Sequence, residues 1–254
     1  MYTIHSEVKN MEHRELTLPH RGVGIHVKLD LPEGAEGGPL ALVIHGLTGH
    51  MEERHILAAC GAFHRRGIGT LRADMCGHGA SGGDFSEHNL FVWLDQVMAL
   101  TDYAQGLSKR LYIAGHSQGG LAALLSAGMR PDAYEKAVLL APALNILDGA
   151  RKGDLLGRPF DPQRIPNQLP FDHRPLSGTY LRCAQLLDGA WAIDHYSRPV
   201  LLVHGSGDDT VPLACSEWAA ARYQHAALTV LPDDTHCFDL HLTDMAAAIE
   251  AFLP

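Results

Sequence analysis

The sequence lacks the features that identify several common classes of protein. Its five cysteines are irregularly spaced and contain no C-x-x-C pair, so they indicate neither a disulfide framework nor a zinc site. No run of about 18 apolar residues is present, which argues against a transmembrane helix. The first ten residues are polar and charged, without the apolar stretch of a secretory signal. We therefore expect a protein of a reducing compartment, the cytoplasm, with no membrane anchor.

The charge pattern narrows the possible partners. The chain has 20 lysines and arginines against 29 aspartates and glutamates, and its basic residues form no run. This pattern argues against nucleic acid and anionic membrane as partners. His45, His50 and His55 could suggest a metal, but a five-residue spacing scatters side chains around a helix and no carboxylate cluster accompanies them. We predict a small-molecule ligand and no metal or other cofactor.

The 254 residues show the alternation of strand and helix patterns that is typical of an α/β fold with a mostly parallel sheet. Residues 15–18 and 25–31 flank a glycine-containing turn and predict an antiparallel hairpin at the start of the sheet. The helices predicted most clearly are residues 90–105, with a core-facing stripe of Leu90, Leu94, Val97 and Thr101, and residues 243–252. Near-continuous apolar runs predict buried parallel strands at Leu40 to Ile44, Ile68 to Arg72, Leu111 to Ala114, Ala137 to Leu140, Val200 to Val203 and Leu228 to Leu231.

The alternation breaks once, in a proline-rich segment that is too long for a simple connection. We interpret residues 142–198 as a small inserted cap. Residues 1–141 and 199–254 then form the core of a single domain.

Ser117 is the predicted nucleophile. It lies in Gly115-His116-Ser117-Gln118-Gly119, directly after a predicted strand and before a helical run. The α/β-hydrolase nucleophile turn requires this context of strand, tight turn and helix, with small residues two positions on either side of the serine. A second match, Gly79-Ala80-Ser81-Gly82-Gly83, lies in a glycine-rich loop without a helix behind it, so we assign Ser81 to loop structure.

The other two members of a Ser-His-Asp triad are expected after the late strands, in the chain order of α/β-hydrolases. Asp208 and Asp209 follow the strand at 200–203, and His236 follows the strand at 228–231, ahead of the last helix. We favour Asp208 as the acid because it is nearer the strand end, while Asp209 is placed to cap the following turn and stays the alternative. His236 is the predicted general base.

Two backbone amides are the predicted oxyanion-hole donors. The first is the amide of Gln118, at the start of the helix that follows the nucleophile. The second is the amide of Leu47, in a glycine turn at the end of the strand 40–44.

With these motifs, the chain resembles the bacterial cinnamoyl/feruloyl esterases of the α/β-hydrolase superfamily over nearly its whole length. The resemblance rests on His45-Gly46-Leu47-Thr48-Gly49, Gly77-His78-Gly79-Ala80-Ser81-Gly82, the nucleophile turn, and two cap runs, residues 165–171 and 178–182. The cap runs are its specific part. The resemblance implies a serine carboxylesterase that hydrolyses hydroxycinnamate esters through an acyl-enzyme, and a possible homodimer.

The resemblance also implies substrate contacts from the cap. Tyr180 would hydrogen-bond the phenolic hydroxyl of the acid. Gly149 stands where some relatives carry an acidic residue, and Asp148 or Asp154 could replace that residue.

Other functions fit the same scaffold, because fold and triad do not fix the substrate. Monoacylglycerol lipase, thioesterase and general short-chain carboxylesterase are the enzyme alternatives. The cap is rich in proline, aspartate and arginine, whereas a lipase cap should present a broad apolar surface. A catalytically silent hydrolase-fold receptor would be expected to have lost a triad residue, and all three are present.

Overall fold

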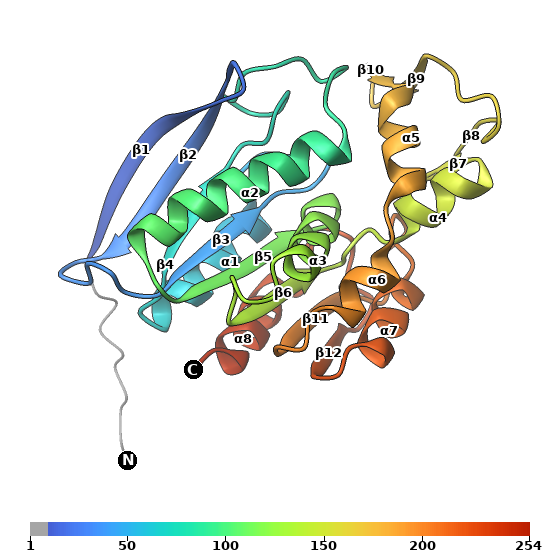
Figure 1. The fold of residues 1–254 in the computed structure, drawn as a ribbon. Helices are drawn as coiled ribbons and strands as arrows, with labels where there is room; N and C mark the ends of the chain where they lie inside the picture. Colours follow the sequence, from blue (N-terminus) through green and yellow to red (C-terminus); the bar gives the residue numbers. More distant parts are fainter. Residues whose placement is uncertain (1–9) are drawn as a thin grey trace.

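The fold is built on an eight-stranded sheet with helices on both faces (Figure 1), seen in a computed structural model that describes residues 10–254. The strand order is β1-β2-β4-β3-β5-β6-β11-β12. From β4 to β12 neighbouring strands are parallel, while β2 runs antiparallel to both β1 and β4. The strands are β1 (Met11–His20), β2 (Val23–Pro32), β3 (Leu40–Ile44), β4 (Gly69–Ala73), β5 (Leu111–His116), β6 (Lys136–Leu140), β11 (Val200–Gly205) and β12 (Ala226–Leu231).

The predicted α/β-hydrolase sheet is confirmed, and the ends of the six parallel strands differ from the prediction by no more than two residues. The hairpin is confirmed but is longer than predicted, because β1 is an edge strand whose exposed, polar side chains give little apolar pattern. Its turn is Arg21-Gly22, and both residues have positive φ. Residues 1–9, part of the segment predicted to lack a secretory signal, lie outside the described part.

The parallel strands are apolar throughout because both of their faces are covered. In β3, Leu42 packs into the core on one side of the sheet and Val43 into the core on the other. The helices α2 (Leu90–Leu107) and α3 (Gln118–Met129) cover the first side. The helices α1 (Arg54–Arg65) and α8 (Leu242–Phe252) cover the second (Figure 1). This alternation of adjacent residues between two cores is the period of a strand.

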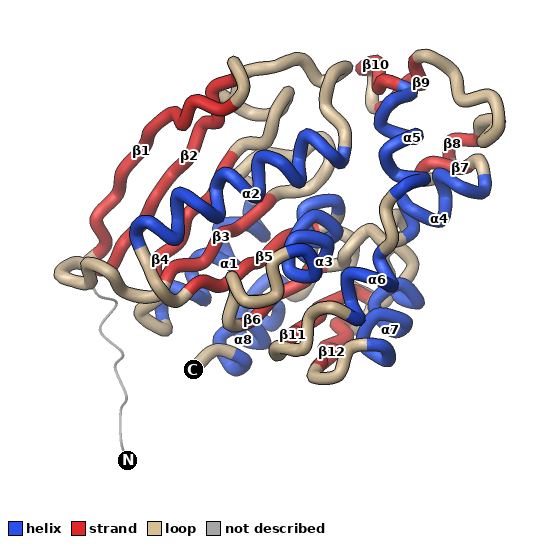
Figure 2. The backbone as a smooth tube through the Cα atoms, viewed as in Figure 1, coloured by secondary structure: helices blue, strands red, loops and turns tan. Residues whose placement is uncertain are grey.

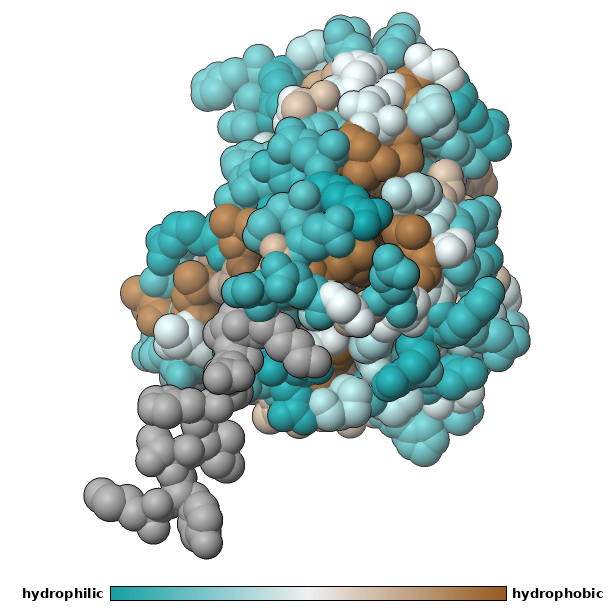
Figure 3. Space-filling view, turned by 90° about the vertical axis from the view of Figure 1, so that its left-hand side faces the viewer, coloured by the Kyte–Doolittle hydropathy of each residue, from teal (hydrophilic) through white to brown (hydrophobic). Residues whose placement is uncertain are grey.

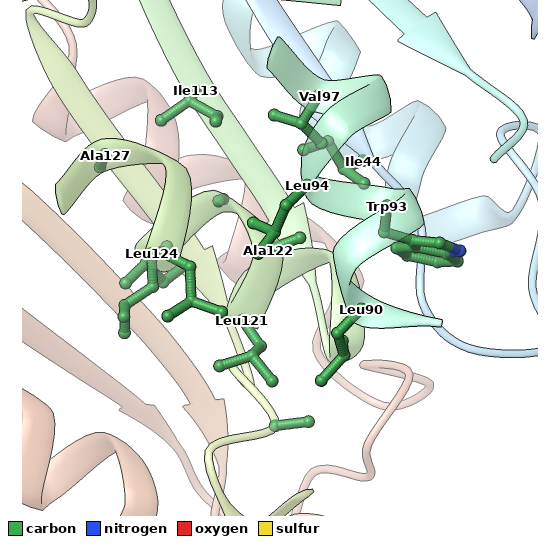
Figure 4. Packing of buried hydrophobic residues seen from close by; sticks show 14 of the residues in the cluster. Ile44, Leu90, Trp93, Leu94, Val97, Ile113, Leu121, Ala122, Leu124 and Ala127 are labelled. Carbon is green, nitrogen blue, oxygen red and sulfur yellow. The ribbon is translucent and has the colours of Figure 1, made fainter. Parts of the chain in front are cut away.

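Helix α2 faces the first core with the predicted stripe, since Leu90, Leu94, Val97 and Thr101 are all buried. Trp93, Leu100 and Ala104 are buried as well, so the contact is broader than one stripe. Figure 4 shows α2 side chains lying against residues of α3 and the sheet, including Leu121, Ala122 and Ile113.

The segment between β6 and β11 contains three helices and four short strands that are not part of the eight-stranded sheet. Most of it stands at one end of the molecule, away from the sheet (Figures 1 and 2). It forms α4 (Asn145–Lys152), β7 (Asp154–Leu155), β8 (Arg158–Pro159), β9 (Gln168–Phe171), β10 (Arg174–Ser177), α5 (Gly178–Leu186) and α6 (Gly189–Asp194), and the short strands pair as β7-β8 and β9-β10.

Helix α6 lies directly against α3. A Cβ added to Gly128 of α3 would lie 2.5 Å from backbone atoms of Ala192 in α6. The division into a core and a cap at 142–198 stays a prediction, and residues of α4 and α5, such as Ile146 and Leu181, belong to the first core together with Ala192 of α6.

The surface on the side of β1 and β2 is mostly hydrophilic, with apolar side chains in small areas between the polar ones (Figure 3). Across residues 10–254, no helix has the length and apolar character that a membrane span requires. The same residues hold no group of three or more histidines, cysteines, aspartates or glutamates arranged to bind a metal ion.

Candidate active site

Ser117, Asp208 and His236 lie at the same edge of the sheet. Each follows the carboxyl end of a parallel strand, β5, β11 and β12 in turn. In parallel sheets these ends meet at one edge, which is where α/β proteins bind their ligands. The fold therefore collects three side chains that are up to 119 positions apart in the sequence.

Ser117 occupies a strained turn between β5 and α3. Its φ is 55°, in the left-handed region that a serine rarely adopts. A Cβ on Gly115 would lie 2.2 Å from the carbonyl oxygen of Gly119, and one on Gly119 would lie 2.3 Å from that of His45. The two flanking glycines are thus required by the close approach of backbone to backbone, as the motif predicts.

A continuous line of hydrogen bonds joins the three side chains. His236 Nε2 lies 2.9 Å from Ser117 Oγ, and His236 Nδ1 lies 2.6 Å from Asp208 Oδ2. Because a carboxylate only accepts, Nδ1 carries the proton and Nε2 is left to accept the hydrogen of the serine hydroxyl. This arrangement lets an imidazole activate a serine as nucleophile.

The side chain of Asp208 is fully buried, and both of its oxygens accept hydrogen bonds. Oδ1 accepts from the backbone amides of Thr210 and Val211, at 2.9 and 2.8 Å. Burial by itself would raise the pKa of Asp208, but hydrogen bonds from His204 and His236 outweigh burial and hold that pKa below its ordinary value. The carboxyl group therefore stays ionised beside His236.

The structure brings Asp208, and not Asp209, to His236. The expectation that Asp209 caps the following turn is wrong, because Asp208 accepts from the turn amides. Among residues 10–254, the side chain of Asp209 accepts only from the Thr210 hydroxyl, at 3.1 Å. Asp208 can do both tasks because its two oxygens point in different directions. Asp209 lies at the wall of the cavity described below.

The two predicted oxyanion donors flank the serine. Leu47 follows β3, next to β5 in the sheet, and Gln118 begins α3. In residues 10–254, neither backbone N–H is paired with another backbone group in a turn or loop. Leu47 and Ser117 line the same cavity, so the Leu47 amide is available to a group bound at the serine.

A cavity of about 1180 Å³ opens over Ser117 between the core and the segment 145–189. Asp148 and Asp154 line it. Asp148 forms an ion pair with Arg151 at 3.5 Å, and Asp154 accepts from the amide of Gly157 at 2.9 Å. Arg151, Lys152 and Arg158 also line this side, a cationic contribution that the sequence interpretation missed.

The structure does not bring Tyr180 to the wall of this cavity. Tyr180 is a residue of α5 whose side chain is fully buried, and its hydroxyl donates a 2.5 Å hydrogen bond to Gln118 Oε1. Tyr180 thus contacts the residue after the nucleophile. Its predicted contact with a phenolic hydroxyl stays a prediction.

Sequence reasoning also missed three groups near the triad. His204 Nε2 lies 3.2 Å from Asp208 Oδ2 and donates to the Val211 carbonyl, and its place at the end of β11, four residues before Asp208, was a usable signal. Glu53 lines the cavity, and burial raises its pKa. His116 contacts the His236 loop. No pattern in the sequence distinguishes Glu53 from other charged residues.

The chain matches the family model described as serine aminopeptidase, S33, over residues 39–174, more than half of its length. A solved structure of Est1E from Butyrivibrio proteoclasticus with ferulic acid bound is 43% identical, covers 93% of this chain and 97% of that chain, and superposes with a TM-score of 0.91. A second structure of Est1E is 40% identical over 94% of this chain and 96% of that chain, with a TM-score of 0.88.

A curated relative, the pimeloyl-[acyl-carrier protein] methyl ester esterase of Aromatoleum aromaticum, is 43% identical over 68 residues. The match spans 26% of this chain and about a quarter, 27%, of that protein. It is therefore a local likeness, unlike the match to Est1E. With the extent of the family match and the near-complete overlap with Est1E, the chain belongs to the α/β-hydrolase family of serine hydrolases described as serine aminopeptidase, S33, and shares a family with Est1E.

Proposed function

We propose that the protein is a serine carboxylesterase that hydrolyses esters of hydroxycinnamic acids. Ser117 is the nucleophile, His236 the general base and Asp208 the acid that orients the base. The observation that supports this mechanism is the line of hydrogen bonds from Ser117 Oγ through His236 to Asp208 Oδ2.

In the first half of the reaction, His236 Nε2 takes the hydroxyl proton while Ser117 Oγ bonds to the ester carbonyl carbon. The negative charge that develops on the carbonyl oxygen is stabilised by the amides of Leu47 and Gln118. His236 then gives its proton to the alcohol oxygen, the bond from carbon to that oxygen breaks, and the acyl group stays on Ser117.

In the second half, water replaces the alcohol. His236 takes a proton from the water, whose oxygen attacks the acyl carbon. Collapse of the intermediate returns the proton to Ser117 Oγ and releases the acid. Asp208 stays ionised throughout and stabilises the imidazolium that forms twice in each cycle.

The acyl class is inferred from the likeness to Est1E, one of whose structures holds ferulic acid. A flat, rigid aromatic acid loses little conformational entropy when it binds in a cavity with fixed walls. Within the proposed cap, 142–198, Asp148 or Asp154 would accept a hydrogen bond from the substrate, a role supported by the place of both residues in the cavity wall. We also propose a cytoplasmic location and a homodimer, the second testable by light scattering.

The family description keeps peptide hydrolysis as a second candidate, because the same triad cleaves amides. Lipases, thioesterases and short-chain esterases on this fold use the same triad. The test is a substrate panel with methyl ferulate, methyl caffeate, p-nitrophenyl butyrate, a monoacylglycerol, an acyl thioester and an aminoacyl p-nitroanilide. We expect the highest kcat/KM for the two hydroxycinnamates.

Ser117→Ala is the control for this panel. It should abolish turnover and labelling by a fluorophosphonate while the protein stays folded. Normal activity of Ser117→Ala would refute the mechanism. A preference for the glyceride or the anilide over methyl ferulate would refute only the acyl class.

A further inference from the structure

His116, the residue before the nucleophile, lies between α1 and the loop that carries His236. Its side chain is buried, with only 3% of the residue exposed. Its ring lies 4.1 Å from the ring of His55 in α1 and 4.6 Å from the ring of His236, measured between centroids. The ring of Phe238 lies edge-on to the His116 ring, with the two ring centroids 6.0 Å apart. The imidazoles of His55, His116 and the proposed base His236 thus form a row of tilted rings with His116 in the middle.

The hydrogen bonding of His116 fixes which ring nitrogen carries its proton. Nε2 lies 2.8 Å from the backbone carbonyl oxygen of His236, and a carbonyl can only accept. Nε2 therefore holds the hydrogen and donates it. In the described residues Nδ1 is buried without a partner, close to the backbone of Gly46, where an added Cβ would lie 3.2 Å from it.

His236 lies in the loop that connects β12 to α8, and this loop itself contains no helix or strand. Its side chain is held by Asp208, but a side-chain contact alone does not fix the backbone from which the ring projects. The backbone of this connection bends sharply nearby, with Phe238 at a φ of 59°. The bond from His116 acts on the carbonyl of His236 itself.

We propose that His116 is a positioning residue, which holds the His236 backbone through its Nε2–H and thereby sets His236 Nε2 against Ser117 Oγ. The proposal rests on the proposed triad and extends it. His116 is the last residue of β5 and Ser117 follows it directly, so the two groups that contact His236 come from adjacent residues. A small rotation of the loop would otherwise lengthen the 2.9 Å contact between base and nucleophile.

The imidazole of His116 also stays neutral in this buried position. Burial, together with the neighbouring His55 and His236, lowers its pKa well below the ordinary value, and the nearby Asp208 only partly opposes this effect. A neutral ring keeps the donor without adding a positive charge beside the base.

The test compares His116→Gln with His116→Leu and His116→Asn. A glutamine amide nitrogen can reach the position of imidazole Nε2, whereas leucine has no donor and asparagine is too short. We expect kcat for methyl ferulate to fall about tenfold in the Leu and Asn variants, with KM changed less than about twofold, and to be largely restored in the Gln variant. Thermal unfolding of each variant identifies any that do not fold.

A spectroscopic measurement separates positioning from packing. The proton on His236 Nδ1, shared with Asp208, should give a far-downfield NMR signal that is lost in Asp208→Asn. We expect this signal in wild type and the Gln variant, and a shifted or broadened one in the Leu and Asn variants. If the Leu variant does not fold, the Gln and Asn pair decides the outcome.

Equal losses of kcat in the Gln and Asn variants, or losses that appear in KM alone, would overturn the proposal. So would an unchanged signal in the Asn variant. These results are distinguishable from a failure of the proposed function, which would appear as no turnover of the ester by wild-type protein or as normal activity of Ser117→Ala.

Discussion

At the scale of single residues, Asp208 shows how one buried carboxylate can serve both structure and chemistry. One oxygen accepts from His236 and the other from the amides of the turn. Asp209, its neighbour, has the same side chain but an exposed position and no contact with the base. The two residues are therefore a matched pair for mutation.

We predict that Asp208→Asn lowers kcat by up to about 10⁴ while Asp209→Asn changes it less than about twofold. The asparagine amide would donate toward His236 Nδ1, forcing the proton onto Nε2, which could then no longer accept from Ser117. Oδ1 would still cap the turn, so folding should be preserved. Steady-state kinetics with methyl ferulate measure both variants, and the reverse ranking would assign the acid to Asp209.

Tyr180 is the second residue where burial sets the expected result. Because its hydroxyl is bonded to Gln118 away from the cavity wall, we predict that Tyr180→Phe lowers kcat/KM for methyl caffeate and p-nitrophenyl butyrate by the same factor. Loss of this bond should also lower the free energy of unfolding by roughly 0.5–1.5 kcal/mol, the worth of one hydrogen bond. A larger loss for the caffeate ester alone would show that Tyr180 contacts the phenolic hydroxyl.

At the scale of elements, the nucleophile turn depends on the close packing of β5 and α3 against β3. Gly119, the second residue of α3, lies where any side chain would meet the backbone of Ile44 and His45. Gly106, near the end of α2, is exposed, and a Cβ there would meet nothing within 4 Å. A side chain is therefore excluded at Gly119, whereas there is space for one at Gly106.

We predict that Gly119→Ala destabilises the protein by about 1–3 kcal/mol, since the strand backbone must move, and lowers kcat by displacing the neighbouring Gln118 amide. Gly106→Ala should instead stabilise it by about 0.5–1 kcal/mol, because alanine loses less conformational freedom in a helix. Urea unfolding and kcat measured on both variants check the pair. Equal stability of the two would contradict the packing argument.

At the scale of the whole molecule, buried neutral histidines dominate the response to acid. Burial is the main cause that lowers the pKa of His45 and His88 to about 3 and that of His55 and His78 to about 4. In the unfolded chain a histidine takes up its proton near pH ~6.5. Between these values the unfolded state binds more protons than the folded state.

We therefore predict that the free energy of unfolding is highest above pH ~6.5 and falls as the pH drops toward about 4, by up to about 1.4 kcal/mol per pH unit for each such histidine. Urea unfolding at a series of pH values from 7.5 to 4.5 measures the slope. His88→Gln should reduce the slope by about one proton. A stability that is constant over this range would mean that these rings are protonated in the fold.

Much of the fold could be predicted because the apolar runs of the parallel strands face two cores and so are continuous in sequence. The exposed β1 and the short strands of the segment 154–177 were predicted poorly or not at all. Along these strands exposed side chains alternate with buried or half-buried ones, so each strand has few apolar residues in sequence to detect.

For the candidate site, the sequence by itself determined which residues could react, because the serine turn needs glycines at fixed positions and the chain order places an acid and a histidine after late strands. The tertiary structure placed Asp208 rather than Asp209 against His236, brought His116 and Glu53 near the same histidine, and turned Tyr180 to Gln118. These outcomes depend on which way a side chain points and what buries it. Both are fixed by packing between elements far apart in the chain, and local sequence patterns carry no record of that packing.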